Sequence, residues 1–143
     1  MQKICEYLEE AFLAMNILYK KTMDGENICY RLDLPDTSIL YRTAELIIDR
    51  MFIAEFHACT AKGISPKMRG IILEKINEFH GKFRLIRLSV DQNNDLYACQ
   101  QMILVGDEAI MCKQIMTNLL VFYDLHKRTA QEILKIIQTK NDE

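Results

Sequence analysis

The chain has 143 residues, about the size of one ordinary domain, and half of these residues are hydrophobic. Its formal net charge is −2, and Lys and Arg gather nowhere into a strong patch, so the sequence argues against a nucleic-acid partner. No apolar run approaches the roughly 20 residues that span a bilayer, which argues against a membrane partner.

The first stretch, residues 2 to 15, predicts an amphipathic helix. Ile4, Leu8, Phe12 and Met15 recur at helical spacing, with glutamates on the other side. The same glutamates interrupt the apolar core that an export signal needs. The chain has five cysteines, widely spaced and without a Cys-x-x-Cys pair, a pattern typical of buried thiols in a reducing cytoplasm. We therefore expect a cytoplasmic protein without a disulfide framework or a zinc site.

A β-hairpin is predicted next. Asp24-Gly25 lies between two β-rich runs and is typical of a tight turn. In the second run, apolar residues alternate with polar ones, as in a half-buried strand; the apolar positions are Ile28, Tyr30, Leu32 and Leu34. Pro35 ends this strand.

Residues 45–60 have features of both a helix and a strand. Ala, Glu, Leu and Met favour a helix, whereas the isoleucines and phenylalanines favour a strand. Leu46, Ile48, Phe52, Ala54 and Phe56 share one face under strand alternation, with Arg50 as the exception. We predict a single strand here.

The segment from Ser65 to Gly81 predicts a second helix. Ser65 is a natural N-cap, Pro66 suits the first helical position and Gly81 suits the stop. Its buried stripe is predicted at Met68, Ile72, Ile76 and Phe79. His80, just before this stop, is expected to serve the helix C-terminus, where a partial positive charge on the side chain is favourable.

A second hairpin is predicted from the strands on either side of QNND. Asp91, Asn93 and Asp95 alternate like the first ligands of a calcium loop. Leu96 and Met102, however, stand where that loop needs Gly and a bidentate Glu. Asn and Asp also stabilise tight turns, so a hairpin turn is the better interpretation.

The last segment predicts a long helix that Asp107 caps and that runs to about residue 138. A break or bend between Asp124 and Thr129 is one alternative, because the apolar spacing is interrupted at Thr129. The order is therefore α-β-β-β-α-β-β-α, without a repeat or a linker. Such an order predicts one α+β domain over residues 1–143, a sandwich with helices on one side of a five-stranded, mainly antiparallel sheet.

The run INEFHGKFRLIRLSVDQNNDLYACQQMIL resembles the centre of the YbjN family. Ile76, Asn77, Phe83, Asp91 and Asp95 occupy the places of its helix end, basic-aromatic step and acidic turn, and Gly106-Asp107 also fits. The resemblance covers roughly residues 16 to 125. It implies the fold of type III secretion chaperones, a regulatory role and no established catalytic residues. The connection 36–45 and the last helix are longer than this fold needs.

The first functional hypothesis is a non-enzymatic protein-binding or regulatory module that acts as a homodimer. Its partner would be a protein or peptide segment bound at a sheet edge or in an apolar groove. A type III secretion-type chaperone for a protein substrate differs from this module only in the partner. The interface is predicted at the following residues: Phe52, Phe56, Ile115, Leu119 and Phe122. No cofactor or metal is expected.

The alternative from another class is a small thiol- or metal-dependent enzyme. Glu55, His57 and Cys59 fall on one face of the predicted strand, where a thiol and an imidazole could cooperate. The spacing is what any strand gives, and no nucleophile elbow, P-loop or glycine-rich phosphate turn accompanies it. Solvent-facing polar residues at a strand end are the better interpretation.

Overall fold

The computed structural model describes residues 1–35 and 43–141, so most of the predicted connection 36–45 lies outside the described residues. The described elements follow in the order α1 (Gln2–Ala14), β1 (Leu18–Asp24), β2 (Asn27–Asp33), β3 (Thr43–Ile48), β4 (Ile53–Ala61), α2 (Pro66–Lys82), β5 (Arg87–Val90), β6 (Leu96–Ile103) and α3 (Glu108–Asn141). This is the predicted α+β class with one more strand than expected.

The described strands form one antiparallel sheet of six strands in the order β1-β2-β3-β4-β6-β5. The prediction of a single strand over residues 45–60 is wrong, because the segment forms β3, a turn and β4. This accounts for the extra strand. Asp49 makes that turn: its carboxylate accepts the N–H groups of Met51 at 2.8 Å and Ile53 at 3.0 Å. Phe52 takes a positive φ of 58° there. Arg50, which broke the predicted alternation, lies in the turn.

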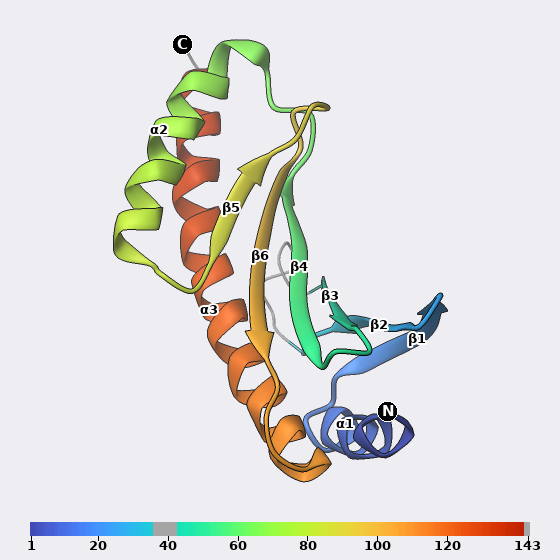
Figure 1. Cartoon of the computed structure of the whole chain (residues 1–143). Coiled ribbons are helices and arrows are strands. Elements are labelled where there is room, and N and C mark those ends of the chain that lie inside the picture. Colours follow the sequence, from blue (N-terminus) through green and yellow to red (C-terminus); the bar gives the residue numbers. More distant parts are fainter. Residues whose placement is uncertain (36–42, 142–143) are drawn as a thin grey trace.

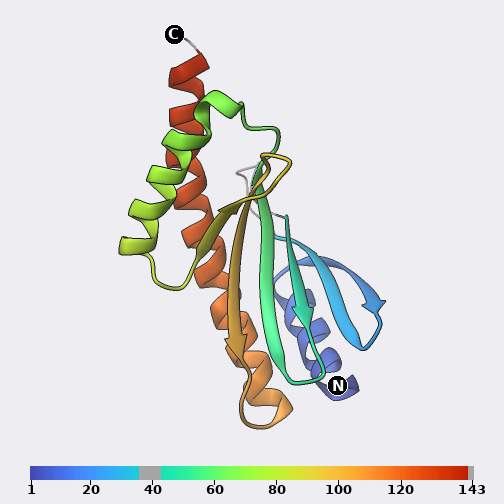
Figure 2. The same cartoon turned by 45° about the horizontal axis from the view of Figure 1, so that its top comes forward.

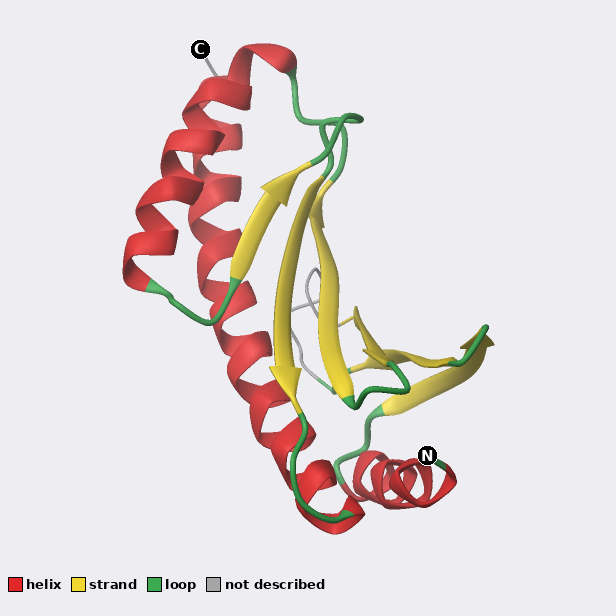
Figure 3. Cartoon of the chain, in the orientation of Figure 1, coloured by secondary structure: helices red, strands yellow, loops and turns green. Residues whose placement is uncertain are grey.

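The helices cover one face of the sheet, as predicted (Figures 1 and 3). Along β2, Ile28, Tyr30 and Leu32 are buried beneath them, in agreement with the predicted alternation. Phe12 of α1 packs edge-on to Tyr30 at 5.4 Å between ring centroids. The other side of the sheet, which we call the open face, carries Arg31 and the alternate residues of the other strands, and no described helix packs on it.

Both predicted hairpin turns are confirmed. In the first, Asp24 pairs with Asn27, so Gly25 and Glu26 form the turn, and Gly25 supplies its positive φ of 61°. In the second, the carboxylate of Asp91 accepts the N–H groups of Asn93 at 2.8 Å and Asp95 at 3.0 Å. This carboxylate therefore stabilises a turn, as the amino-acid preferences indicated.

Helix α2 buries the predicted stripe of Met68, Ile72, Ile76 and Phe79. The predicted stop at Gly81 is wrong, because the helix continues to Lys82 and ends at Phe83. His80 also has a different contact from the one expected: its Nε2 accepts the N–H of Leu88 on β5 at 3.0 Å. The imidazole therefore connects the end of α2 to the edge of the sheet.

Helix α3 runs unbroken over Glu108–Asn141, so the alternative of a break between Asp124 and Thr129 is wrong. The carboxylate of Asp107 accepts the N–H of Ile110 at 2.9 Å, which confirms the predicted cap.

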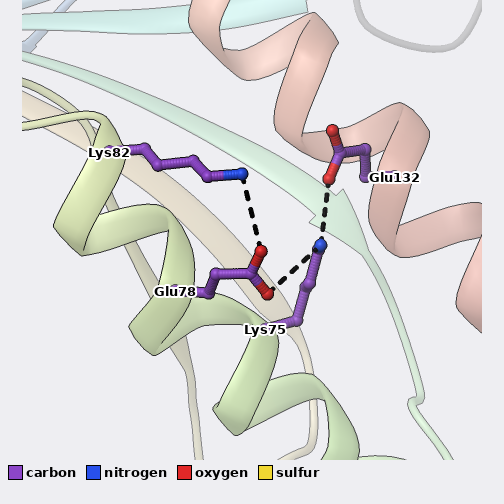
Figure 4. A network of polar contacts seen from close by, with 4 residues as sticks. All are labelled: Lys75, Glu78, Lys82 and Glu132. Atoms are coloured by element: carbon purple, nitrogen blue, oxygen red, sulfur yellow. Dashed lines mark hydrogen bonds and ion pairs between the residues drawn. The ribbon is translucent and has the colours of Figure 1, made fainter.

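A charged network joins α3 to α2 (Figure 4). The ammonium of Lys75 lies 3.2 Å from Glu132 of α3 and 3.3 Å from Glu78 of its own helix. Lys82 also contacts Glu78, at 3.5 Å. The Lys75 contact lowers the pKa of Glu78. Helices α2 and α3 lie side by side in both views (Figures 1 and 2).

Candidate binding surface on the open face

The two residues of the enzyme hypothesis lie together on the open face, but they do not form a reactive pair. Cys59 donates its thiol to the carbonyl of Ala61 at 3.8 Å, and burial raises the pKa of that thiol. The ring of His57 instead stacks on Tyr97, with 5.0 Å between centroids. A nucleophilic cysteine needs a lowered thiol pKa, so the environment of Cys59 opposes this role.

Cys99 lies opposite His57 in the register of β4 and β6, and its thiol pKa is raised as well. Its thiol donates to Glu55 at 3.0 Å, and burial together with that carboxylate raises the pKa of Cys99 to about 12. Among the described residues, no group of three or more His, Cys, Asp or Glu side chains has a geometry that could hold a metal ion. The chemistry of this face is therefore that of neutral thiols and surface charges.

The open face is hollowed at its centre. The larger hollow, which we call the main hollow, has a volume of about 560 Å³, within the usual size range of ligand sites. The second hollow has about 290 Å³ and shares Arg31 and Thr43 with the first. The main hollow is lined by Arg31, Thr43, Ala44, Glu45, His57, Ala58, Cys59, Lys62 and Tyr97. The second is lined by Leu18, Tyr19, Lys20, Arg31, Asp33 and Thr43.

Strand β1 borders the second hollow and forms one edge of the sheet. All seven of its residues are exposed, and no described strand pairs with its outer side. Its side chains include the apolar Leu18, Tyr19 and Met23, which are unusual at this exposure on an edge strand. An edge of this kind offers unpaired main-chain N–H and C=O groups together with side-chain contacts.

Strand β1 is nevertheless firmly held from the helix side. The ring of Tyr19 lies 5.6 Å from Phe12 and 5.8 Å from Tyr30. Lys21 makes an ion pair with Glu9 of α1 at 3.3 Å, and Glu9 also accepts the hydroxyl of Tyr30 at 2.9 Å. The edge is therefore an ordered platform.

The interface residues predicted from the sequence lie elsewhere. Phe56 and Phe122 stack on each other in the core, with 5.6 Å between ring centroids. Ile115 and Leu119 of α3 are buried too, and only Phe52 is half-exposed. Side chains buried within one chain are not available to a partner in this conformation. An interface at these residues stays a prediction, and we expect Phe122→Glu to abolish folding, because it would bury an unpaired charge.

Sequence reasoning missed Lys20 and Arg31, which the structure brings together on the open face. They are directly opposite each other in the register of β1 and β2. The signal was available: once Gly25 and Glu26 are the two turn residues, counting outward along both strands sets Lys20 against Arg31. What the turn could not reveal is that β1 lies at the edge of the sheet.

Comparison with known proteins supports the fold. A crystal structure of YbjN from E. coli, described as a candidate transcription regulator, matches over 90% of this chain and 89% of that chain. The TM-score is 0.60 and the sequence identity is 12%. The chain therefore has a YbjN-type fold, as the sequence resemblance indicated. No family model and no curated protein matches the sequence. No helix in the described part of the chain is both long and apolar enough to cross a membrane.

Proposed function

We propose that this protein is a non-enzymatic regulatory module that binds an extended segment of a partner protein at β1. The observation that carries the proposal is the state of this edge strand, with seven exposed residues and no described neighbour on its outer side. A peptide that adds to such an edge gains main-chain hydrogen bonds along its length, while alternate side chains supply specificity.

The order of β1 supports binding. Because Tyr19 and Lys21 are already held by α1 and β2, little conformational freedom is lost when a peptide docks. Each new main-chain hydrogen bond contributes about 1 kcal/mol net, so side-chain contacts must supply much of the selectivity. Tyr19 and Met23 face the helix side and offer apolar contacts there.

The homodimer predicted from the sequence uses the last helix, the adjoining sheet or both, and it stays a prediction. A second copy could instead pair with the β1 edge. A two-fold antiparallel pairing centred on Thr22 would set Lys20 against Asp24 of the second copy. Only residues 20–24 of each strand would then pair, because Tyr19 would already oppose the turn residue Gly25. A register centred on Lys21 would pair the whole strand, but it would set Lys21 of the two copies against each other and leave no acid opposite Lys20. A foreign segment can pair with the whole of β1 without that repulsion, so we propose a foreign segment as the partner and keep the dimer as a competing outcome.

The test uses proline to block the edge. Asp24 and Asn27 pair across a two-residue turn, so the alternation of the ladder points the N–H of Met23 outward. Met23→Pro removes that donor without removing a bond to β2, and edge strands tolerate proline. Met23→Ala is the matched control, because it shortens the same side chain and keeps the N–H.

Peptides selected by display on the wild-type protein are titrated, with a fluorescent label, against the three proteins. We expect Met23→Pro to weaken their binding at least about tenfold and Met23→Ala to weaken it about threefold or less. Circular dichroism confirms that each variant is folded. A selection that yields no binders, or binders indifferent to the proline, contradicts strand addition at β1.

A further inference from the structure

We infer that the segment bound at β1 carries an acidic side chain opposite Lys20, where its carboxylate is held by Lys20 and Arg31. This inference rests on the proposed function and specifies the chemistry of the partner. Both cations line the second hollow beside the edge strand. A peptide residue placed opposite Lys20 on the open face would project its side chain toward the same hollow.

The first support is that these two cations have no ion-pair partner in the described part of the chain. Neither Lys20 nor Arg31 makes an ion pair within residues 1–35 and 43–141, although Lys21 between them in sequence pairs with Glu9 at 3.3 Å. Glu45 is the neighbour of Arg31 on β3, yet the two do not approach as a salt bridge. On the helix side of the β1–β2 hairpin, Lys21 is therefore paired with an acid, whereas on the open face Lys20 and Arg31 are not paired with any described acid.

The second support is the position of the two charges. Like charges directly opposite each other on neighbouring strands repel and destabilise the pair. The register sets Lys20 against Arg31, with no acid between them. A carboxylate bound at this place removes the repulsion, so binding gains from a strain that the unbound sheet carries.

The third support is the charge balance of the joined hollows. Their cations are Lys20, Arg31 and Lys62, and their acids are Glu45 and Asp33. Asp33 already accepts the hydroxyl of Thr43 at 3.3 Å. The excess is local and small, which suits one or two carboxylates of a peptide. It is far from the extended basic surface that a nucleic-acid backbone needs.

A first experiment tests the repulsion without any partner. We expect Lys20→Gln to raise the Tm by about 1 °C, because it removes one of two opposed like charges. Lys113→Gln is the matched control, since Lys113 is exposed on α3 and makes no ion pair among the described residues. A Tm that falls in Lys20→Gln, or that rises equally in both variants, contradicts the proposed repulsion between Lys20 and Arg31.

The second experiment is a double-mutant cycle with the display-selected peptides. We expect Asp or Glu to be enriched at one alternate position of these peptides. Changing that residue to its amide should weaken binding to the wild-type protein about tenfold, and less than about twofold for the double variant Lys20→Gln/Arg31→Gln. The loss on the wild type should shrink as salt is added.

The remaining outcomes separate this inference from the proposed function. Binders that Met23→Pro blocks but that carry no enriched acid overturn the acidic partner and leave strand addition standing. Acidic binders indifferent to Met23→Pro overturn both. If inorganic phosphate raises the Tm of the wild type as much as an acidic peptide does, the site binds a free anion, and the inference that it binds a peptide carboxylate is wrong. If the protein dimerises with rising concentration and the dimer is lost in Lys20→Gln, the edge binds a second copy, and the inference of a segment from another protein is wrong.

Discussion

The two edge strands of this sheet have opposite environments. Strand β5 is short, lies against α2, and donates the outward N–H of Leu88 to His80. Strand β1 is longer, and every residue of it is exposed. One sheet thus has a protected edge and an available edge, and they lie at opposite ends of the strand order.

The difference shows which features keep an edge strand from pairing with another chain. Unpaired edges invite other chains, and proteins usually shorten, cover or charge them. Here β5 is short and covered by α2, whereas β1 is longer and its only protection is the charge of Lys20, Lys21 and Asp24. Under the proposed function, a segment with an acidic side chain would neutralise the charge at this edge, whereas a segment without one would not.

Leu88 and Leu18 offer a direct comparison, because the same amino acid stands on the two edges. Leu88 is 4% exposed. We expect Leu88→Ala to lower the free energy of unfolding by about 2–5 kcal/mol, because it leaves a cavity beneath α2. Urea denaturation measures this loss. A loss below about 1 kcal/mol would mean that the covered edge is loosely packed.

The covered side can also be probed by pH. His126 of α3 is 1% exposed and contacts the hydroxyl of Thr60 at 2.9 Å, and burial lowers its pKa from 6.5 to about 4. A histidine with a lowered pKa is protonated more readily when unfolded, so its contribution to stability is lost as the pH falls below 6.5. We expect this group to account for about 2 kcal/mol of lost stability between pH 7 and pH 5.

The measurement is the free energy of unfolding at both pH values in the wild type and in His126→Gln, where this loss should disappear. His57→Gln is the matched control, because it makes the same substitution at a half-buried site on the open face. Equal pH dependence in the wild type and His126→Gln would show that the covered side admits water to this imidazole.

The smallest effect is expected at the available edge. Leu18 is 72% exposed, so Leu18→Ala removes almost no buried surface. We expect the free energy of unfolding to change by less than about 0.5 kcal/mol. The same denaturation series that includes Leu88→Ala measures it. A loss comparable to that of Leu88→Ala would show that β1 is already covered in solution, for example by a second copy.

Much of the fold could be predicted from the sequence, because its helices and hairpins have local signals. The stripe of α2, the alternation of β2 and the Asp107 cap are examples. The turn between β3 and β4 was missed because it contains neither Gly nor Pro. Its positive φ falls on Phe52, a residue that ordinarily avoids that conformation, and the carboxylate of Asp49 stabilises it.

The candidate site was harder to predict, since it depends on topology. The apolar residues chosen as an interface, such as Phe56 and Phe122, are apolar because they form the core. Binding surfaces are better indicated here by the groups that have no partner within residues 1–35 and 43–141: the outer side of β1 and the charges of Lys20 and Arg31. Pairing order and ion-pair partners are long-range properties that sequence periodicity does not encode.

The unbroken helix α3 makes the two ends of the molecule depend on each other. Its early turns pack against α1, which holds the β1–β2 hairpin, and its later turns pack against α2, which covers β5. We expect that detachment of either end would loosen the packing of α3 against the other end. Local opening is therefore costly on both sides, and hydrogen exchange deep in the sheet should proceed only through global unfolding. A peptide bound at β1 would accordingly slow exchange in the distant β5–β6 hairpin as well.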